Sequence, residues 1–141
     1  MDGVRHHPMT GKERRFVEVG KKIAEMSDFG EYRHGAVLVK GGSVINTSAN
    51  KNSYAPWGNR FRKRDCGHAT HHAELGCILG LDRSVTKGAT IYVVRIGKRG
   101  DLKLSKPCDM CREVLQHVGI KKVVYTIDDK LVGYYRITNN D

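Results

Sequence analysis

The sequence is poor in several features that would mark a specialised class of protein. Its 141 residues include three prolines, four cysteines and one tryptophan. Four cysteines are too few for a secreted disulfide scaffold, and the apolar runs are only a few residues long, which excludes a membrane-spanning helix. The first ten residues carry charge without an apolar core, so we do not expect a signal peptide. These absences favour a reduced, cytoplasmic protein with no membrane partner.

Acidic residues are also scarce, since 15 Asp and Glu stand against 25 Lys and Arg and give a formal net charge of +10. The excess is concentrated between Lys51 and Lys106, where twelve basic residues accompany four acidic ones. This imbalance favours an anionic partner, either a nucleotide phosphate or a nucleic-acid backbone. A solvated basic face that maintains solubility explains the charge equally well.

The hydrophobic pattern is that of one mixed α/β domain over residues 1–141, with residues 1–9 flexible. We expect a helix that Thr10 and Glu13 cap, and whose buried stripe comprises Phe16, Val19, Ile23 and Met26. Further helices are expected at about residues 71–81 and from Pro107 onwards, and strands at about residues 36–39, 44–47, 89–96, 120–126 and 134–138.

The order of these elements predicts a mixed sheet with helices on its faces. The pair Gly41-Gly42 joins the first two strands as a hairpin. About seven residues, 127–133, separate the last two strands. A parallel crossover needs a dozen or more residues, so the last strand should be antiparallel to its neighbour.

Two short segments carry the chemistry, His72-Ala73-Glu74 and Pro107-Cys108-Asp109-Met110-Cys111. Because Cys108 and Cys111 are three residues apart on a helix, their sulfurs face the same side and can bind one metal ion. One imidazole and two thiolates leave the fourth position of tetrahedral zinc open, which is typical of a catalytic site. Glu74 is well placed to stand beside the metal-bound water as a proton carrier.

The combination H-x-E and P-C-x-x-C resembles the zinc-dependent cytidine and deoxycytidylate deaminase superfamily. Residues 70–74 are similar to the family's T-x-H-A-E, and the order of elements along most of the chain is also the family's. The resemblance implies a three-layer α/β/α cytidine-deaminase-like fold with a mixed five-stranded sheet. It also implies a homo-oligomer and a hydrolase that converts cytosine to uracil in a nucleoside or nucleotide, through a zinc-bound hydroxide and a glutamate proton shuttle.

The resemblance also assigns individual residues. It implies that zinc is held by His72, Cys108 and Cys111, and that Glu74 shuttles the protons. It further implies that the backbone N–H of Ala73 binds the pyrimidine carbonyl oxygen and that Asn50 contacts the sugar. Arg112 follows Cys111 directly, and its guanidinium either donates to a ligand sulfur and tunes the metal or is an exposed helix charge.

The substrate stays open, because the motifs combine features of several branches. A histidine as first ligand is similar to the deoxycytidylate, tRNA-adenosine and nucleic-acid-editing branches, whereas residues 111–115 are similar to the C-R-Q-V-L of free-cytidine deaminases. An alternative is therefore a deaminase that acts on cytosine or adenine in single-stranded DNA or RNA. In the loop at about residues 51–69, aromatic and basic residues alternate in a way that suits a stacked base and its phosphate, namely Tyr54, Trp57, Arg60, Phe61, Arg62, Lys63 and Arg64.

A different class of protein is also compatible with these cysteines. If Cys66, His68 or His71 supplied a fourth ligand, the zinc site would be closed and the chain would be a non-catalytic, zinc-stabilised binding module. Cys66 and His68 are also candidates for a second, structural zinc. The closed site leaves Glu74 and Asn50 without roles, which favours the open, catalytic interpretation.

Overall fold

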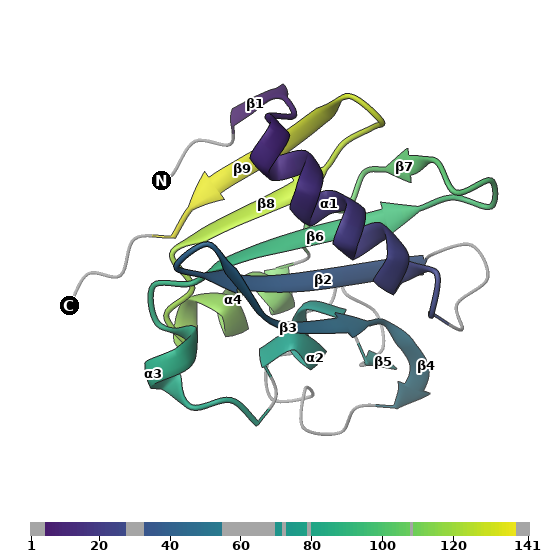
Figure 1. Ribbon diagram of the computed structural model, residues 1–141. Coiled ribbons are helices and arrows are strands. Elements are labelled where there is room, and N and C mark those ends of the chain that lie inside the picture. Colours follow the sequence, from purple (N-terminus) through teal and green to yellow (C-terminus); the bar gives the residue numbers. More distant parts are fainter. Residues whose placement is uncertain are drawn as a thin grey trace.

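The computed structural model describes residues 5–27, 33–54, 70–71, 73–78, 80–107 and 109–137. Within these residues the strands are β1 (Arg5–Pro8), β2 (Arg33–Lys40), β3 (Ser43–Ala49), β4 (Lys51–Tyr54), β5 (Thr70–His71), β6 (Thr90–Ile96), β7 (Leu102–Lys103), β8 (Lys122–Thr126) and β9 (Leu131–Arg136). The helices of the same part of the chain are α1 (Gly11–Ala24), α2 (Ala73–Ile78), α3 (Arg83–Thr86) and α4 (Asp109–His117). Helix α1 lies on one face of the main sheet, and α2, α3 and α4 lie on the other, so the fold has three layers (Figure 1).

The main sheet is mixed, with the strand order β1-β9-β8-β6-β2-β3 and with β7 paired to β6. Strands β6 and β8 are parallel, and α4 lies in the connection between them. The predicted hairpin is confirmed, because β2 and β3 are antiparallel and Gly41 and Gly42 both have positive φ, at 62° and 80°. The last strand is also as predicted, since β9 runs antiparallel to β8.

The strand count differs from the five that the sequence predicts. Strands β2, β3, β6, β8 and β9 are the predicted ones, and β1 and β7 extend the same sheet to seven strands in the described residues. The segment 5–8, expected to be flexible, forms β1 and pairs with the outer edge of β9. His7 anchors this strand, because its ring packs against Tyr134 at 5.1 Å between centroids and its Nε2 lies 2.8 Å from the Glu13 carboxylate.

Helix α1 has the predicted capping box and part of the predicted buried stripe, since Phe16 is buried and Val19 packs against the same cluster. The Glu13 N–H donates to Thr10 Oγ1 at 3.2 Å, and the Thr10 N–H donates to Glu13 Oε1 at 3.0 Å. Met26 lies beyond the end of the helix and is 74% exposed, which contradicts its predicted place in the core. The residues buried on this helix are Glu13, Phe16, Val17, Gly20 and Ala24.

The buried face of α1 is displaced from the predicted stripe because the helix approaches the sheet through glycine. A Cβ added to Gly35 of β2 would collide with the carbonyl oxygen of Gly20, and a Cβ added to Gly20 would lie 2.5 Å from Val94 Cγ2. The backbones of α1 and β2 are therefore in direct contact, and neither glycine has room for a side chain.

The two helices of the motif segments begin later than the sequence suggests. The predicted helix over residues 71–81 is α2, which begins at Ala73, because Thr70–His71 form β5 and pair with β4. The helix expected from Pro107 is α4, which begins at Asp109 in the described residues and is followed by Gly119 at φ +87°. None of the helices in the described residues has the length and apolar character needed to cross a bilayer.

The core has one hydrophobic cluster on each face of the sheet. The cluster beneath α2 and α4 contains Cys77, which is fully buried and donates from Sγ to the carbonyl oxygen of Ala36 at 3.3 Å. Burial raises the pKa of the Cys77 thiol to about 12. Side chains alternate between the clusters along each strand, so Ile91 and Val93 of β6 face α2 and α4, whereas Tyr92 and Val94 face α1.

Candidate active site

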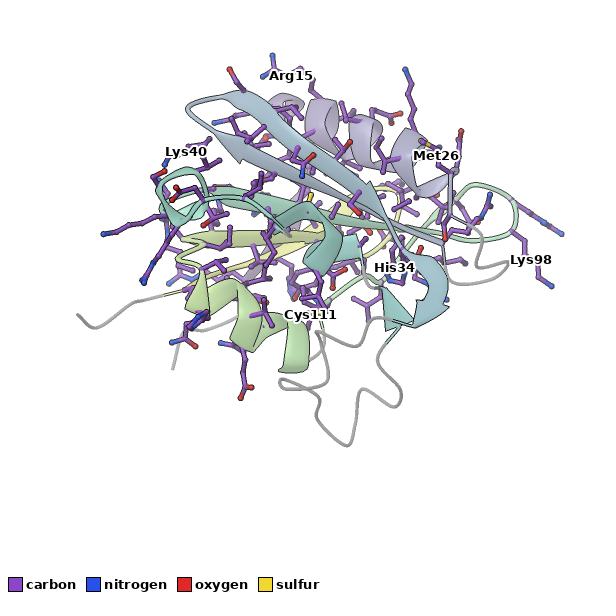
Figure 2. The ribbon with its side chains drawn as sticks, turned by 90° about the horizontal axis from the view of Figure 1, so that it is seen from below. Arg15, Met26, His34, Lys40, Lys98 and Cys111 are labelled. Atoms are coloured by element: carbon purple, nitrogen blue, oxygen red, sulfur yellow. The ribbon has the colours of Figure 1, made fainter. Side chains whose placement is uncertain are left out.

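The two motif segments meet on the same face of the sheet. Helices α2 and α4 contact each other there, and Cys111 is labelled on α4 in Figure 2. Glu74 in the first turn of α2 is only 5% exposed, and Cys111 of α4 is fully buried. Full burial is ordinary for a cysteine, but a carboxylate is rarely taken out of solvent unless it is paired or functional.

Tyr135 of β9 is a further buried residue on this face of the sheet. Its side chain is 1% exposed and belongs to the same cluster as Cys111. Burial raises the pKa of Tyr135, the Arg112 guanidinium opposes this shift, and the charges of Glu74 and Cys111 add to it. Three charged groups from α2 and α4 therefore act on one phenol. The sequence analysis did not single out Tyr135.

Asn50, the predicted sugar contact, is fixed at the end of β3 by hydrogen bonds to the adjacent strand. Its Oδ1 accepts from the His34 N–H at 2.8 Å and from the Ser27 hydroxyl, and its own N–H donates to the His34 carbonyl oxygen at 3.1 Å. The side chain is 7% exposed. Since both acceptor contacts are made by Oδ1, the carboxamide presents its NH₂ group on the opposite side.

The residues predicted to complete the site are only partly described. Ala73, whose N–H is predicted to bind the pyrimidine carbonyl, is fully buried as the first residue of α2. His72 and Cys108 lie outside the described residues, and the described part of the chain contains no group of three or more His, Cys, Asp and Glu that could hold a metal. The donors that are described fit zinc, because a thiol and a carboxylate are both buried where α2 contacts α4. In the same cluster as Cys111, the Tyr135 hydroxyl has no hydrogen-bond partner among the described residues.

The segment that leads to Cys108 is held against the sheet by a buried serine. Ser105 is 2% exposed, and its Oγ donates to the Val93 carbonyl oxygen at 2.7 Å and accepts from the Thr126 N–H at 2.9 Å. The Ser105 N–H also donates to the Thr126 carbonyl oxygen at 3.0 Å. These bonds join the segment 105–107 to the middle of β6 and to the last residue of the parallel strand β8, and so fix where the chain enters α4.

Arg112 lies over an aromatic ring. Its guanidinium carbon is 4.7 Å from the ring centroid of Tyr135, a cation–π distance. Arg112 thus packs on the ring of Tyr135. The side chain is half-buried, so it is not the exposed helix charge that was the alternative interpretation.

Two further residues with cationic or titratable side chains, His34 and Arg95, lie on neighbouring strands beside Asn50. His34 of β2 pairs with Arg95 of β6 in antiparallel register, and alternation places both on the α2 and α4 face with Ala36 and Val93. Both side chains are half-buried, and His34 is labelled in Figure 2. The sequence analysis missed this pair, because only the register of β2 against β6 brings the two residues together.

The remaining candidates divide into packing residues and residues outside the described chain. Tyr125 lies across Gly133 of β9, where a Cβ would collide with its ring, and it is 4% exposed, so it is a packing residue. The loop residues 57–64, together with Cys66 and His68, lie outside the described residues. Of the side chains of Tyr54 and His71 nothing is described.

Comparison with known proteins agrees with this geometry. The family model "Cytidine and deoxycytidylate deaminase zinc-binding region" matches residues 10–127. No curated protein sequence matches the chain. Among solved structures, the dCMP deaminase from the cyanophage S-TIM5 in apo form is similar with a TM-score of 0.55 and 19% identity over 84% of this chain and 86% of that one.

A second similar structure is Acinetobacter baumannii RibD, form 2, with a TM-score of 0.52 and 19% identity over 82% of this chain. The match spans only 28% of the RibD chain, so RibD is a much longer protein of which this fold is one part. At 19% identity both structures show the fold alone. The match of the family model over most of the chain shows more, and the chain belongs to the cytidine and deoxycytidylate deaminase family.

Proposed function

We propose that the chain is a zinc-dependent hydrolytic deaminase that converts cytosine to uracil in a nucleoside or nucleotide. The observation that carries the proposal is the burial of Glu74 and Cys111 together at the junction of α2 and α4, inside the region that the family model matches. A non-catalytic binding module has no use for a carboxylate buried at this junction, because such a group is expensive to bury unless it is paired or functional.

We assign the metal ligands to His72, Cys108 and Cys111. When bound, zinc supplies a nucleophile from water at neutral pH. Glu74 takes a proton from the attacking water and delivers it to the ring nitrogen next to the reacting carbon. The bond between that carbon and the amino nitrogen then breaks, Glu74 passes the second proton to the departing ammonia, and the product is uracil.

The substrate is held by groups that the fold fixes in advance. The N–H of Ala73 binds the pyrimidine carbonyl oxygen, and the NH₂ of Asn50 donates to a sugar hydroxyl. The hydrogen bonds to His34 and Ser27 hold the Asn50 carboxamide in one orientation, which supports this role. Neighbouring sheet positions run from Asn50, the sugar contact, through His34 to the cationic side chain of Arg95. This arrangement favours a substrate with a phosphate, a nucleotide, over a bare nucleoside.

The test follows ammonia release by the zinc-loaded protein across cytidine, deoxycytidine, their mono- and triphosphates, adenosine, guanine and cytosine-containing oligonucleotides. We expect turnover of a free cytosine nucleotide, and a loss of ~10²–10⁴-fold or more in Glu74→Gln with zinc retained. Activity confined to oligonucleotides, with affinity that falls steeply with salt, would establish the polynucleotide alternative. A zinc-loaded protein that releases ammonia from none of these compounds would contradict the proposal.

A further inference from the structure

The side chain of Asn50 takes the place of a backbone group at the end of the β2–β3 ladder. In an antiparallel ladder, a hydrogen-bonded pair of residues exchanges two N–H···O=C bonds. The Asn50 N–H donates to the His34 carbonyl oxygen at 3.1 Å as one such bond, but the His34 N–H donates to the side-chain oxygen Oδ1 of Asn50 at 2.8 Å. The carboxamide is therefore tied to the end of the sheet, with Oδ1 as the atom that faces β2.

A second donor reaches the same oxygen from the end of α1. The Ser27 hydroxyl donates to Asn50 Oδ1, although 23 residues separate the two in the chain. Ser27 is itself held by the last turn of α1, because its N–H donates to the Ala24 carbonyl oxygen at 3.0 Å. The end of α1 comes this close to β2 because Gly35 has no side chain, and a Cβ at Gly35 would lie 2.7 Å from the Ala24 nitrogen. The packing of helix on sheet thus brings Ser27 to Asn50.

These two hydrogen bonds decide what the carboxamide offers to a ligand. A carboxamide oxygen accepts through two lone pairs, and the bonds from His34 and Ser27 use both. A ligand that binds this side chain therefore meets its NH₂ group, which only donates. Two donors on the oxygen also polarise the amide, so the NH₂ group becomes a stronger donor. The arrangement suits an oxygen acceptor such as that of a sugar hydroxyl.

We propose that Ser27 is a positioning residue for the substrate's sugar, whose hydroxyl holds the Asn50 carboxamide so that its NH₂ group donates to a sugar hydroxyl. This inference rests on the proposed function, because it requires Asn50 to bind the sugar. Without Ser27, the bond from the His34 N–H still orients the oxygen but holds the carboxamide at one point only. Substrate binding must then order the side chain, which weakens the contact.

The test compares KM and kcat of the zinc-loaded wild type and Ser27→Ala for cytidine, 2′-deoxycytidine, 3′-deoxycytidine and their 5′-monophosphates. We expect Ser27→Ala to raise KM about 3–10-fold for the compounds that carry the hydroxyl bound by Asn50, with kcat nearly unchanged. The KM of the compounds that lack this hydroxyl should stay at the wild-type value. The corresponding uridine products should show the same pattern in Kd by calorimetry, where no chemical step intervenes.

Three further variants serve as controls. Ser43→Ala makes the same change at an exposed position at the other end of β3, and it should leave every KM unchanged. Ser27→Thr keeps a hydroxyl at the end of α1 and should keep the sugar preference of the wild type. Asn50→Asp retains an oxygen for both donors but lacks the NH₂ group, so it should abolish the preference, and Ser27→Ala should add little to it. Thermal unfolding of each variant verifies that it is folded.

Three results would overturn the inference. The first is a Ser27→Ala protein with the wild-type KM and Kd for the compounds that carry the hydroxyl. The second is an equal rise in KM for all the sugars, which would make Ser27 a general packing residue. The third is a wild type that releases ammonia from all three sugars with equal KM, which would remove the sugar from Asn50 but leave the deaminase function intact. A protein that releases ammonia from none of them would instead refute the proposed function, so the two failures are distinguishable.

Discussion

Replacement of Ser105 by alanine tests whether the sheet positions the segment that carries the cysteine ligands. The substitution removes the hydroxyl that donates to the Val93 carbonyl oxygen at 2.7 Å and accepts from the Thr126 N–H at 2.9 Å. The lost bonds are buried, and each polar group left without a partner costs about 1–3 kcal/mol. Some of the polar groups that lose the Ser105 hydroxyl keep other polar neighbours, which limits the cost. We therefore expect a total loss of about 2–4 kcal/mol in the free energy of unfolding. For a domain of this size that corresponds to a fall of roughly 6–15 °C in Tm.

The assay is urea unfolding of the wild type, Ser105→Ala and Ser43→Ala under identical metal conditions. Ser43 is exposed at the start of β3, so its replacement controls for the change of residue type and should alter stability by less than about 0.5 kcal/mol. We also expect Ser105→Ala to lose zinc to a chelator faster than Ser43→Ala, because the entry into α4 is no longer fixed. Equal stability and equal zinc retention in the two variants would refute the role given to Ser105.

Three further predictions concern Arg95, Gly133 and Glu13. Arg95→Met, which removes the charge and keeps the length, should raise KM for a cytosine nucleotide by about 10-fold or more and leave the nucleoside nearly unaffected; equal effects on both would remove Arg95 from the phosphate. Gly133→Ala should destabilise the protein by about 1–3 kcal/mol because its Cβ meets the Tyr125 ring, and Tyr125→Leu in the same chain should recover part of this loss in thermal unfolding. Burial acts to raise the pKa of Glu13, but hydrogen bonds such as that from the Thr10 N–H lower it below the usual 4.5. Its contribution is therefore present above pH 4.5 and lost as the pH falls, so the stability advantage of the wild type over Glu13→Gln should shrink in acid.

The sequence is a good guide wherever structure depends on neighbours in the chain. The capping box at Thr10 and Glu13 needs residues three apart, and the hairpin needs two glycines in a row, so both could be predicted and both are present. The direction of β9 followed from the shortness of the connection before it. The burial of Glu74 and Cys111 is consistent with a motif that is itself local.

Features that depend on contacts between residues far apart in the sequence could not be predicted. Met26 follows the apolar spacing of α1 but lies beyond its last residue, Ala24. The close approach of Gly20 to Gly35 determines which face of the helix is buried. Strand β1 forms since the edge of β9 offers backbone partners, which nothing in residues 5–8 reveals. The contact of Arg112 with Tyr135 joins α4 to β9 and needs the complete sheet.

The buried thiol of Cys77 has a practical consequence for reagents that modify cysteine. Alkylation requires the thiolate, and a pKa of about 12 against the ordinary 9.0 leaves about a thousandfold less of that form at neutral pH. Its sulfur is also enclosed by α2, β2 and β3, where it donates to Ala36 and lies 3.6 Å from the Asn46 carbonyl oxygen. We therefore expect that such reagents do not modify Cys77 in the folded protein. Its alkylation would therefore report unfolding.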